Sequence, residues 1–228
     1  MSYFLHIETA TDVCSVALSK EDKLIVLNEE KDSLKHSEII TLQIKDVMDR
    51  GEVQLSDLSA VSLSEGPGSY TSLRVGMSAA KAICFSYDIP LISVNTLESL
   101  AYSSSSNIQD DYLICPMIDA RRMEVYASLY YKDMNPIFEN TPIILNEDSF
   151  RNYFEKGYKI FFSGNGANKT KGLFKEEKTI YTNLVCSAKN LIIPALEKFK
   201  KKKFEDIAYF SPNYIKPPNI TTPKVKHL

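Results

Sequence analysis

The feature that most constrains the fold is a pattern of short apolar runs and turns that occurs twice in the same order. In residues 7–18 a strand ends in an acidic residue, and a turn leads to a second strand; residues 118–129 have the same pattern at the same spacing. Further along each half, at 61–68 and at 160–166, an apolar strand runs into a glycine-containing loop before a predicted helix. Two matched pairs in one order favour a duplicated domain, and each half has the order strand, strand, strand, helix, strand, helix.

The first half shows its elements most clearly, because alternating residues predict a three-stranded meander and capped periodic segments predict helices. The expected strands are 3–7, 14–18, 23–27, 60–63 and 91–94, and the expected helices are 37–50 and 69–87. Residues 102–111 are polar and are expected to lack structure, which places the domain boundary there. We therefore expect a first domain at 1–106 and a smaller one at 107–228, with a C-terminal segment that can pack back on the first.

Composition limits the possible functions. The chain has 228 residues, of which 44% are hydrophobic, and its net charge of -2 is not that of a protein that binds nucleic acid by itself. No apolar run suggests a membrane span or a secretory signal, so we expect a cytoplasmic protein. The four cysteines lie in apolar segments without paired spacing, which predicts buried thiols rather than a zinc site: Cys14, Cys84, Cys115 and Cys186.

The glycine loop of the first half is the most specific string in the chain. Gly66 and Gly68 allow a tight turn, and Ser69 can cap the following helix so that its first amides face a cleft. Taken alone, the string is better interpreted as a well-capped strand-to-helix turn than as a ligand site. The facing turn has no glycine, although Thr9 and Thr11 could donate hydrogen bonds to a phosphate, so tight ATP binding by the isolated chain is not expected.

These motifs resemble those of one family in the order in which they occur. Residues 64–76 are similar to the Gly-Pro-Gly-Ser-Phe-Thr-Gly-Leu-Arg-Ile-Gly signature of the TsaB (YeaZ) family, and 7–11 resemble its opening strand. Residues 118–126 resemble its Asp-Ala-Arg hairpin, and 212–217 resemble its C-terminal tail. The chain departs from the family at three positions: Ser72 and Met123 replace common glycines, and Glu8 replaces a common aspartate.

The resemblance implies an α/β protein with the actin-like ATPase (ASKHA, ribonuclease H-like) fold, built as two duplicated βββαβα domains. It also implies a non-catalytic partner of TsaD, which transfers a threonylcarbamoyl group to the adenosine beside the anticodon of tRNA. TsaE, an ATPase, is implied as a further partner, with ATP or ADP bound within the complex. The chain alone is expected to form a homodimer and to reach tRNA only through the complex.

No metal ligand set or catalytic group is expected in this chain. TsaD carries two histidines one helical turn apart, whereas here His36 is followed four residues later by Ile40, which cannot ligate a metal. The other histidines are His6 and His227, and no string suggests a nucleophile with a base and an orienting group. A kinase or ATPase that uses the hairpin turns and 164–166 stays open as the alternative function, and a metallopeptidase lacks support.

Two sets of site residues follow. The candidate nucleotide cleft comprises Thr9, Thr11, Gly66, Gly68, Ser69, Asp119, Arg121, Gly164 and Gly166. The helices 37–50 and 69–87 have wide apolar faces and small residues, which suggests a helical partner interface. That interface comprises His36, Ile40, Ile44, Val47, Leu73, Gly76, Ala79, Ala80 and Ile83.

Two charged segments have competing interpretations. Asp119, Arg121 and Glu124 could form a charged cleft wall, or the arginine could pair with the carboxylates and hold the hairpin. The segment Lys198 to Lys203 contains five lysines and is expected to be a solvated helix end, although it could contact tRNA weakly within a complex.

Overall fold

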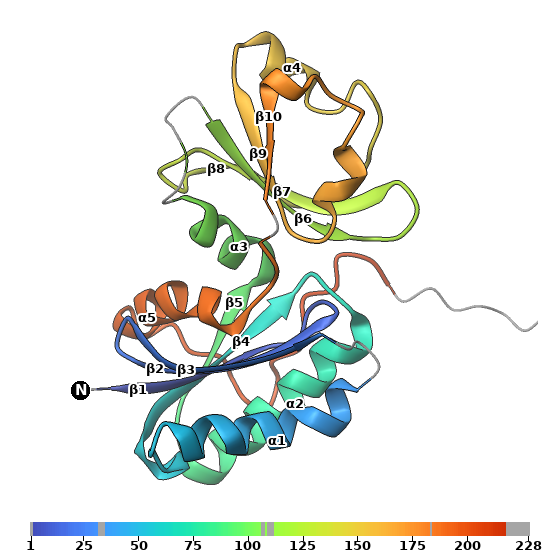
Figure 1. The fold of residues 1–228 in the computed structure, drawn as a ribbon. Helices are drawn as coiled ribbons and strands as arrows, with labels where there is room; N and C mark the ends of the chain where they lie inside the picture. Colours follow the sequence, from blue (N-terminus) through green and yellow to red (C-terminus); the bar gives the residue numbers. More distant parts are fainter. Residues whose placement is uncertain (1, 32–34, 106–107, 109–111, 183, 218–228) are drawn as a thin grey trace, which may run out of the picture.

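The structure is a computed structural model that describes residues 2–31, 35–105, 108, 112–182 and 184–217. It has two lobes stacked one above the other, each built around a five-stranded mixed sheet (Figure 1). The predicted duplication is therefore confirmed. Both sheets have the same arrangement, in which a three-stranded antiparallel meander is extended by two strands parallel to the first.

The first lobe contains the sheet β3-β2-β1-β4-β5. Its strands are β1 (Tyr3–Glu8), β2 (Val13–Lys20), β3 (Lys23–Lys31), β4 (Leu58–Gly66) and β5 (Leu91–Asn95). Helices α1 (His36–Arg50) and α2 (Tyr70–Tyr87) cover one face, and α5 (Ile192–Lys200) covers the other (Figure 1). Side chains of a strand alternate between faces, so Leu5 and Ile7 pack toward α1 and α2 while Phe4 packs toward α5.

The second lobe repeats this topology with shorter helices. The sheet order is β10-β9-β6-β7-β8, with strands β6 (Tyr112–Asp119), β7 (Glu124–Tyr130), β8 (Pro136–Ile144), β9 (Lys159–Ser163) and β10 (Thr179–Tyr181). One short helix, α4 (Arg151–Glu155), packs on it. The helix predicted after Gly166 is wrong: the chain forms the 3-10 turns η2 (Ala167–Thr170) and η3 (Glu176–Lys178) instead. Between them Gly172 adopts a φ of 82°, which an α-helix cannot contain.

The chain crosses between the lobes twice, which changes the domain boundary. Helix α3 (Thr96–Ser105) lies between the lobes, so residues 102–105 of the segment expected to lack structure are helical; of the rest, 106, 107 and 109–111 lie outside the described residues. After β10 the chain returns to the first lobe through η4 (Ala188–Leu191) and α5. The second lobe thus spans about 112–182 rather than 107–228.

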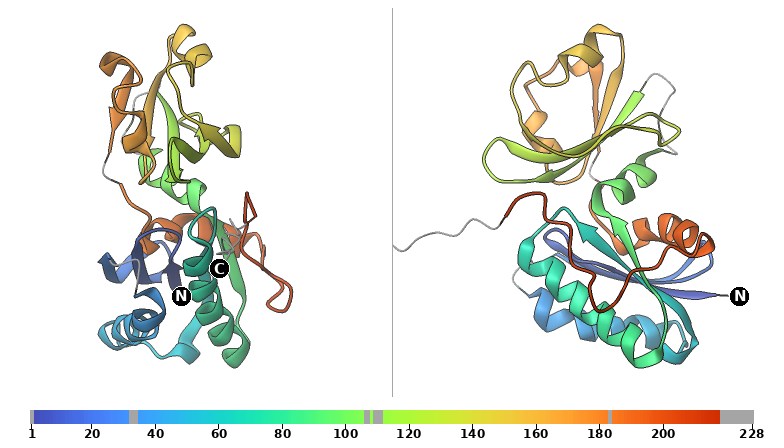
Figure 2. Two further views of the ribbon diagram at one scale, coloured as in Figure 1. Left: turned by 90° about the vertical axis from the view of Figure 1, so that its right-hand side faces the viewer. Right: turned by 180° about the vertical axis from the view of Figure 1, so that it is seen from behind.

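The C-terminal segment 205–217 packs on the first lobe and rises toward the second (Figure 2). The Glu205 amide donates to the Leu91 carbonyl at 2.9 Å, and the Asn213 amide donates to the Glu65 carbonyl at 2.7 Å. The Lys81 ammonium binds the Phe210 carbonyl at 2.7 Å. This segment therefore forms part of the first lobe's surface. The first lobe also contains the 3-10 turn η1 (Leu55–Asp57), which precedes β4.

The topology and the duplication together give the actin-like fold expected from the sequence. Within the described residues, no helix is long and apolar enough to cross a membrane.

Candidate functional site

A cavity of about 510 Å³ lies between the two lobes, where the carboxyl ends of the central strands meet. The β1–β2 turn, the loop before α2, the β6–β7 turn and the C-terminal segment form its walls. Five predicted cleft residues line it: Thr11, Gly68, Ser69, Asp119 and Arg121. The two hairpin turns lie about half the chain apart in sequence. The structure brings them together with the glycine loop.

The amino end of α2 forms the first-lobe wall of this cavity. Ser69 is the N-cap, and its amide donates to the Ala10 carbonyl at 2.7 Å, which joins the glycine loop to the β1–β2 turn. Gly68 lies so close to this turn that a Cβ atom would be 2.7 Å from the Ala10 Cβ, inside van der Waals contact. The first turn of α2 therefore lines the cavity, and a helix amino end is an arrangement that suits an anion.

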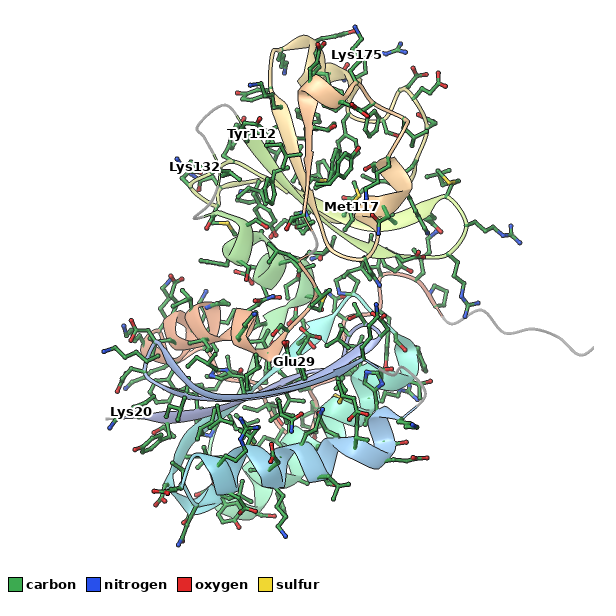
Figure 3. The ribbon with its side chains drawn as sticks, viewed as in Figure 1. Lys20, Glu29, Tyr112, Met117, Lys132 and Lys175 are labelled. Carbon is green, nitrogen blue, oxygen red and sulfur yellow. The ribbon has the colours of Figure 1, made fainter. Side chains whose placement is uncertain are left out.

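The other four predicted cleft residues have structural roles. Thr9 is buried against Gly76, and Gly166 packs against the backbone of Ile118. Gly66 and Gly164 have φ values of 114° and 86°, a conformation that only glycine adopts readily. A side chain at Gly66 would meet the Asn213 carbonyl, and one at Gly164 would meet the carbonyl of Met117, whose own side chain is buried in the second lobe (Figure 3).

The second-lobe wall is held by an ion pair that sequence reasoning missed. Lys169, in η2, donates to the Asp119 carboxylate at 2.7 Å and to the Glu124 carbonyl at 2.9 Å. Asp119 also accepts the Arg121 amide at 2.6 Å. A lysine therefore fixes the β6–β7 hairpin in the way that the sequence suggested for the arginine. The Glu124 carboxylate pairs with Lys216, so the C-terminal segment is tied to the second lobe.

Glu8 lies at the end of β1 behind the cavity and is fully buried. Its Oε1 accepts hydrogen bonds from the Ala10 amide and the Ser64 hydroxyl, both at 2.7 Å. Its Oε2 has no hydrogen-bond partner among the described residues. Burial raises the pKa of Glu8 from 4.5 to about 7, although these hydrogen bonds oppose the rise.

The histidines and cysteines of the described chain are core residues. His6 lies between the hydroxyls of Ser62 and Ser19 at 2.6 and 2.8 Å, and burial lowers its pKa to about 3, so it is neutral at pH 7. His36 and Ile40 are each 3% exposed. All four cysteines are buried, as predicted. No group of three or more His, Cys, Asp or Glu residues that could hold a metal is found in the part of the chain that the structure describes.

Seven of the nine residues of the predicted interface lie inside the first lobe. Burial is complete or nearly so for Ile40, Ile44, Val47, Leu73, Gly76 and Ala80, and His36 is buried beside them. The apolar stripe of α1 packs on the chain's own sheet, so most of these residues are not free to contact a partner. Ala79 and Ile83 are half-buried at the surface.

A groove of about 480 Å³ nevertheless runs between α1 and α2 on this face. Of the predicted set, Ile40 forms part of its floor and Ala79 part of its wall. Its remaining lining residues are Ser37, Thr41, Tyr70, Thr71, Arg74, Val75 and Ser78. Four of these belong to the glycine-containing string 64–76, so a signal for them was present in the sequence.

The C-terminal segment meets α2 between the groove and the cavity. The rings of Tyr70 and Tyr214 stack with centroids 4.3 Å apart. Arg74 donates from Nε to the Tyr214 hydroxyl at 3.0 Å and from Nη2 to the Tyr70 hydroxyl at 2.5 Å. Tyr70 lines both hollows, so this aromatic pair connects them.

The lysine-rich segment at the end of α5 is largely solvated. Lys198 donates to the Ser93 carbonyl at 2.8 Å and lies 3.9 Å from the Glu98 carboxylate. The four lysines at 200–203 are exposed, as expected for a helix end.

The sequence of this chain is similar to those of a known protein family. The family model described as "TsaD: tRNA N6-adenosine threonylcarbamoyltransferase" matches residues 29–222. The TsaB protein of Bacillus subtilis (strain 168) is 28% identical over 217 residues, which cover 93% of each chain. The TsaB protein of Buchnera aphidicola subsp. Acyrthosiphon pisum (strain APS) is 35% identical over 135 residues, 59% of this chain and 60% of that protein. Both are named tRNA threonylcarbamoyladenosine biosynthesis proteins.

Among solved structures, YeaZ from Pseudomonas aeruginosa has the same fold. It superposes with a TM-score of 0.79 at 22% identity, and the match covers 94% of this chain and 100% of that one. Sequence motifs, family model, curated relatives and fold agree over nearly the whole chain. The chain belongs to the family that the TsaD model describes and, within it, to the TsaB (YeaZ) proteins.

Proposed function

We propose that this chain acts in tRNA threonylcarbamoyladenosine biosynthesis as a non-catalytic scaffold that heterodimerises with TsaD. In this role it would be required for threonylcarbamoylation of the adenosine beside the anticodon, while the chemistry belongs to TsaD. The names of the TsaB relatives support the pathway. The observation that carries the pairing is the groove between α1 and α2, whose exposed lining is mostly apolar.

The groove suits a helical partner. Two adjacent helices leave an elongated hollow into which a third helix can pack its apolar side. The TsaD model itself matches this chain over residues 29–222, so TsaD is expected to present a related pair of helices. A pairing of like faces would then build a helical bundle, and in the absence of TsaD a second copy of this chain would take its place.

The non-catalytic role rests on the side chains of α1. Ile40 stands one turn after His36, where a second metal ligand would be needed, and both side chains are buried. The cavity walls carry Asp119, but Lys169 already pairs with it. We infer that this chain stabilises or positions TsaD rather than activating a substrate.

The same proposal places the remaining components. ATP or ADP would bind within the complex, with the α2 amino end and Arg121 facing its phosphates across the cavity. TsaE would join as the ATPase. The tRNA would be held by the complex, and the exposed lysines at 200–203 could make weak contacts with its phosphate backbone.

Reconstitution tests the proposal. Purified TsaD, TsaE and the remaining components would be assayed for tRNA modification with the wild-type chain, with Ala79→Glu and with Ala208→Glu. Ala79 lines the groove, whereas Ala208 is exposed on the C-terminal segment, so the two variants introduce the same charge in different places. We expect Ala79→Glu to abolish both TsaD binding and modification, and Ala208→Glu to retain them. Full modification without this chain would refute the scaffold role.

A kinase or ATPase function is the second candidate, and the cavity between the lobes is the observation that favours it. Five predicted phosphate-site residues line this cavity. This function requires the isolated chain to bind ATP, which titration calorimetry measures directly. No heat of binding at millimolar ATP would remove it, whereas binding that appears only with TsaD present would support the scaffold.

A further inference from the structure

Among the described residues that line the groove between α1 and α2, Arg74 is the one that carries a charge. It extends from the exposed side of α2, and its guanidinium is held in place by Tyr70, one turn earlier, and by Tyr214 from the C-terminal segment. Its Cζ lies 4.2 Å from the centre of the Tyr70 ring. A long side chain that would otherwise sample many rotamers is therefore positioned before any partner binds.

Most of the hydrogen-bonding capacity of this guanidinium is unused. Arginine has five N–H donors, and the two tyrosine hydroxyls accept only two of them. Among the residues that the structure describes, Arg74 forms no ion pair with a carboxylate. A partner that covers the groove would take this cation out of water, and such a loss is tolerated when the partner supplies an acceptor of opposite charge.

We propose that Arg74 binds a carboxylate of the partner, carried on an apolar helix that lies in the groove, and that Tyr214 positions Arg74 for this contact. This inference rests on the proposed function, since the occupant is taken to be a helix of TsaD. It also assigns a role to the C-terminal segment, which would act as part of the partner surface through one hydroxyl group. The planar, fixed guanidinium suits a bidentate contact with an aspartate or glutamate.

A second copy of this chain is the competing occupant. Glu38 is exposed in the first turn of α1, next to the groove residue Ser37, so another copy could also present an acid to Arg74. The two occupants differ in which association depends on Arg74, and the experiment therefore measures both.

The test uses the full-length chain and full-length TsaD in titration calorimetry at two salt concentrations. Arg74→Gln is expected to weaken TsaD binding by about 30-fold or more and to reduce its salt dependence, because a charge pair is lost. Tyr214→Phe keeps the ring stack and removes the acceptor for Nε, so a loss of about 3- to 10-fold is expected with the salt dependence kept. Lys200→Gln, an exposed cation outside the groove, is the matched control and should bind like the wild type.

Each outcome is decisive once circular dichroism and melting temperature show the variants to be folded. TsaD binding by Arg74→Gln within twofold of the wild type, while Ala79→Glu abolishes it, overturns the carboxylate contact and leaves the scaffold role intact. Absence of binding by the wild type would instead remove the scaffold role. If Arg74→Gln weakens only self-association, measured by sedimentation, the occupant is a second copy and the inference is wrong.

Discussion

The substitution Glu8→Gln should remove a large pH-dependent contribution to the stability of the first lobe. Glu8 is fully buried at the end of β1, and burial raises its pKa to about 7. Glutamine keeps the side-chain oxygen that accepts from Ala10 and Ser64, and its amide replaces the protonated oxygen of the neutral acid. The variant therefore mimics the uncharged form of Glu8 at every pH.

The magnitude follows from the difference between the folded and unfolded pKa of Glu8. The unfolded chain releases the proton near pH 4.5, whereas the folded chain holds it until about pH 7. Between these values the folded state binds more protons, so stability is highest below pH 4.5 and falls as the pH rises through 7. At about 1.4 kcal/mol for each pH unit, the wild type should lose about 3 kcal/mol relative to Glu8→Gln.

The difference between the two proteins is needed because His6 acts in the opposite direction. Burial lowers the pKa of His6 from 6.5 to about 3, so its contribution increases as the pH rises from 3 to 6.5. The neighbouring thiols of Cys14 and Cys186 have pKa values raised by burial and do not titrate in this window. The contribution of His6 is the same in the two proteins and therefore cancels in the comparison.

Urea unfolding at intervals from pH 4.5 to 8 measures the effect. We expect the free energy of unfolding of the wild type, relative to Glu8→Gln, to decrease with pH and to level off above about pH 8. Parallel curves for the two proteins would refute the reasoning, because they would mean that Glu8 titrates alike in the folded and unfolded states. If the free energy of unfolding of the wild type relative to Glu8→Gln increased with pH, the folded state would lower the pKa of Glu8, contrary to the prediction.

Two further substitutions test the packing. Gly68→Ala would place a methyl group against the Ala10 backbone and is expected to destabilise the first lobe by about 1–3 kcal/mol; an unchanged urea midpoint would contradict this. Phe162→Ala would leave a cavity between Phe150 and Phe174, whose ring centroids lie 5.7 and 5.9 Å from that of Phe162, and is expected to cost about 3–5 kcal/mol. Tyrosine fluorescence during unfolding should show this loss in the second lobe, and a loss below about 1 kcal/mol would count against the packing described.

Much of the fold was predictable because its signals are local. The alternation of the meander and the cap at Ser69 depend on residues close in sequence, and the strand and helix bounds of the first lobe were predicted to within a few residues. The second lobe was less predictable after Gly166. There the residues have no helical period, and Gly172 with its positive φ separates η2 from η3.

The site residues were harder to predict, because periodicity indicates that a helix face is buried and not what buries it. The stripe that contains Ile44 and Val47 was assigned to a partner, yet the chain's own sheet covers it. Lys169 was missed because it pairs with Asp119 fifty residues away, a contact that only the folded topology creates. Arg74 and Tyr214 are likewise 140 residues apart.

The two crossings between the lobes determine which relative motions the molecule allows. One follows α3, which lies between the lobes, and the other precedes η4 (Figure 1). Two chain connections restrict how far the lobes can slide or twist relative to one another. The partly exposed Lys216–Glu124 ion pair adds a contact between the C-terminal segment and the second lobe. Opening of the lobes would break this ion pair and also the Asn95–Asn140 hydrogen bond at 2.9 Å, which joins β5 to β8.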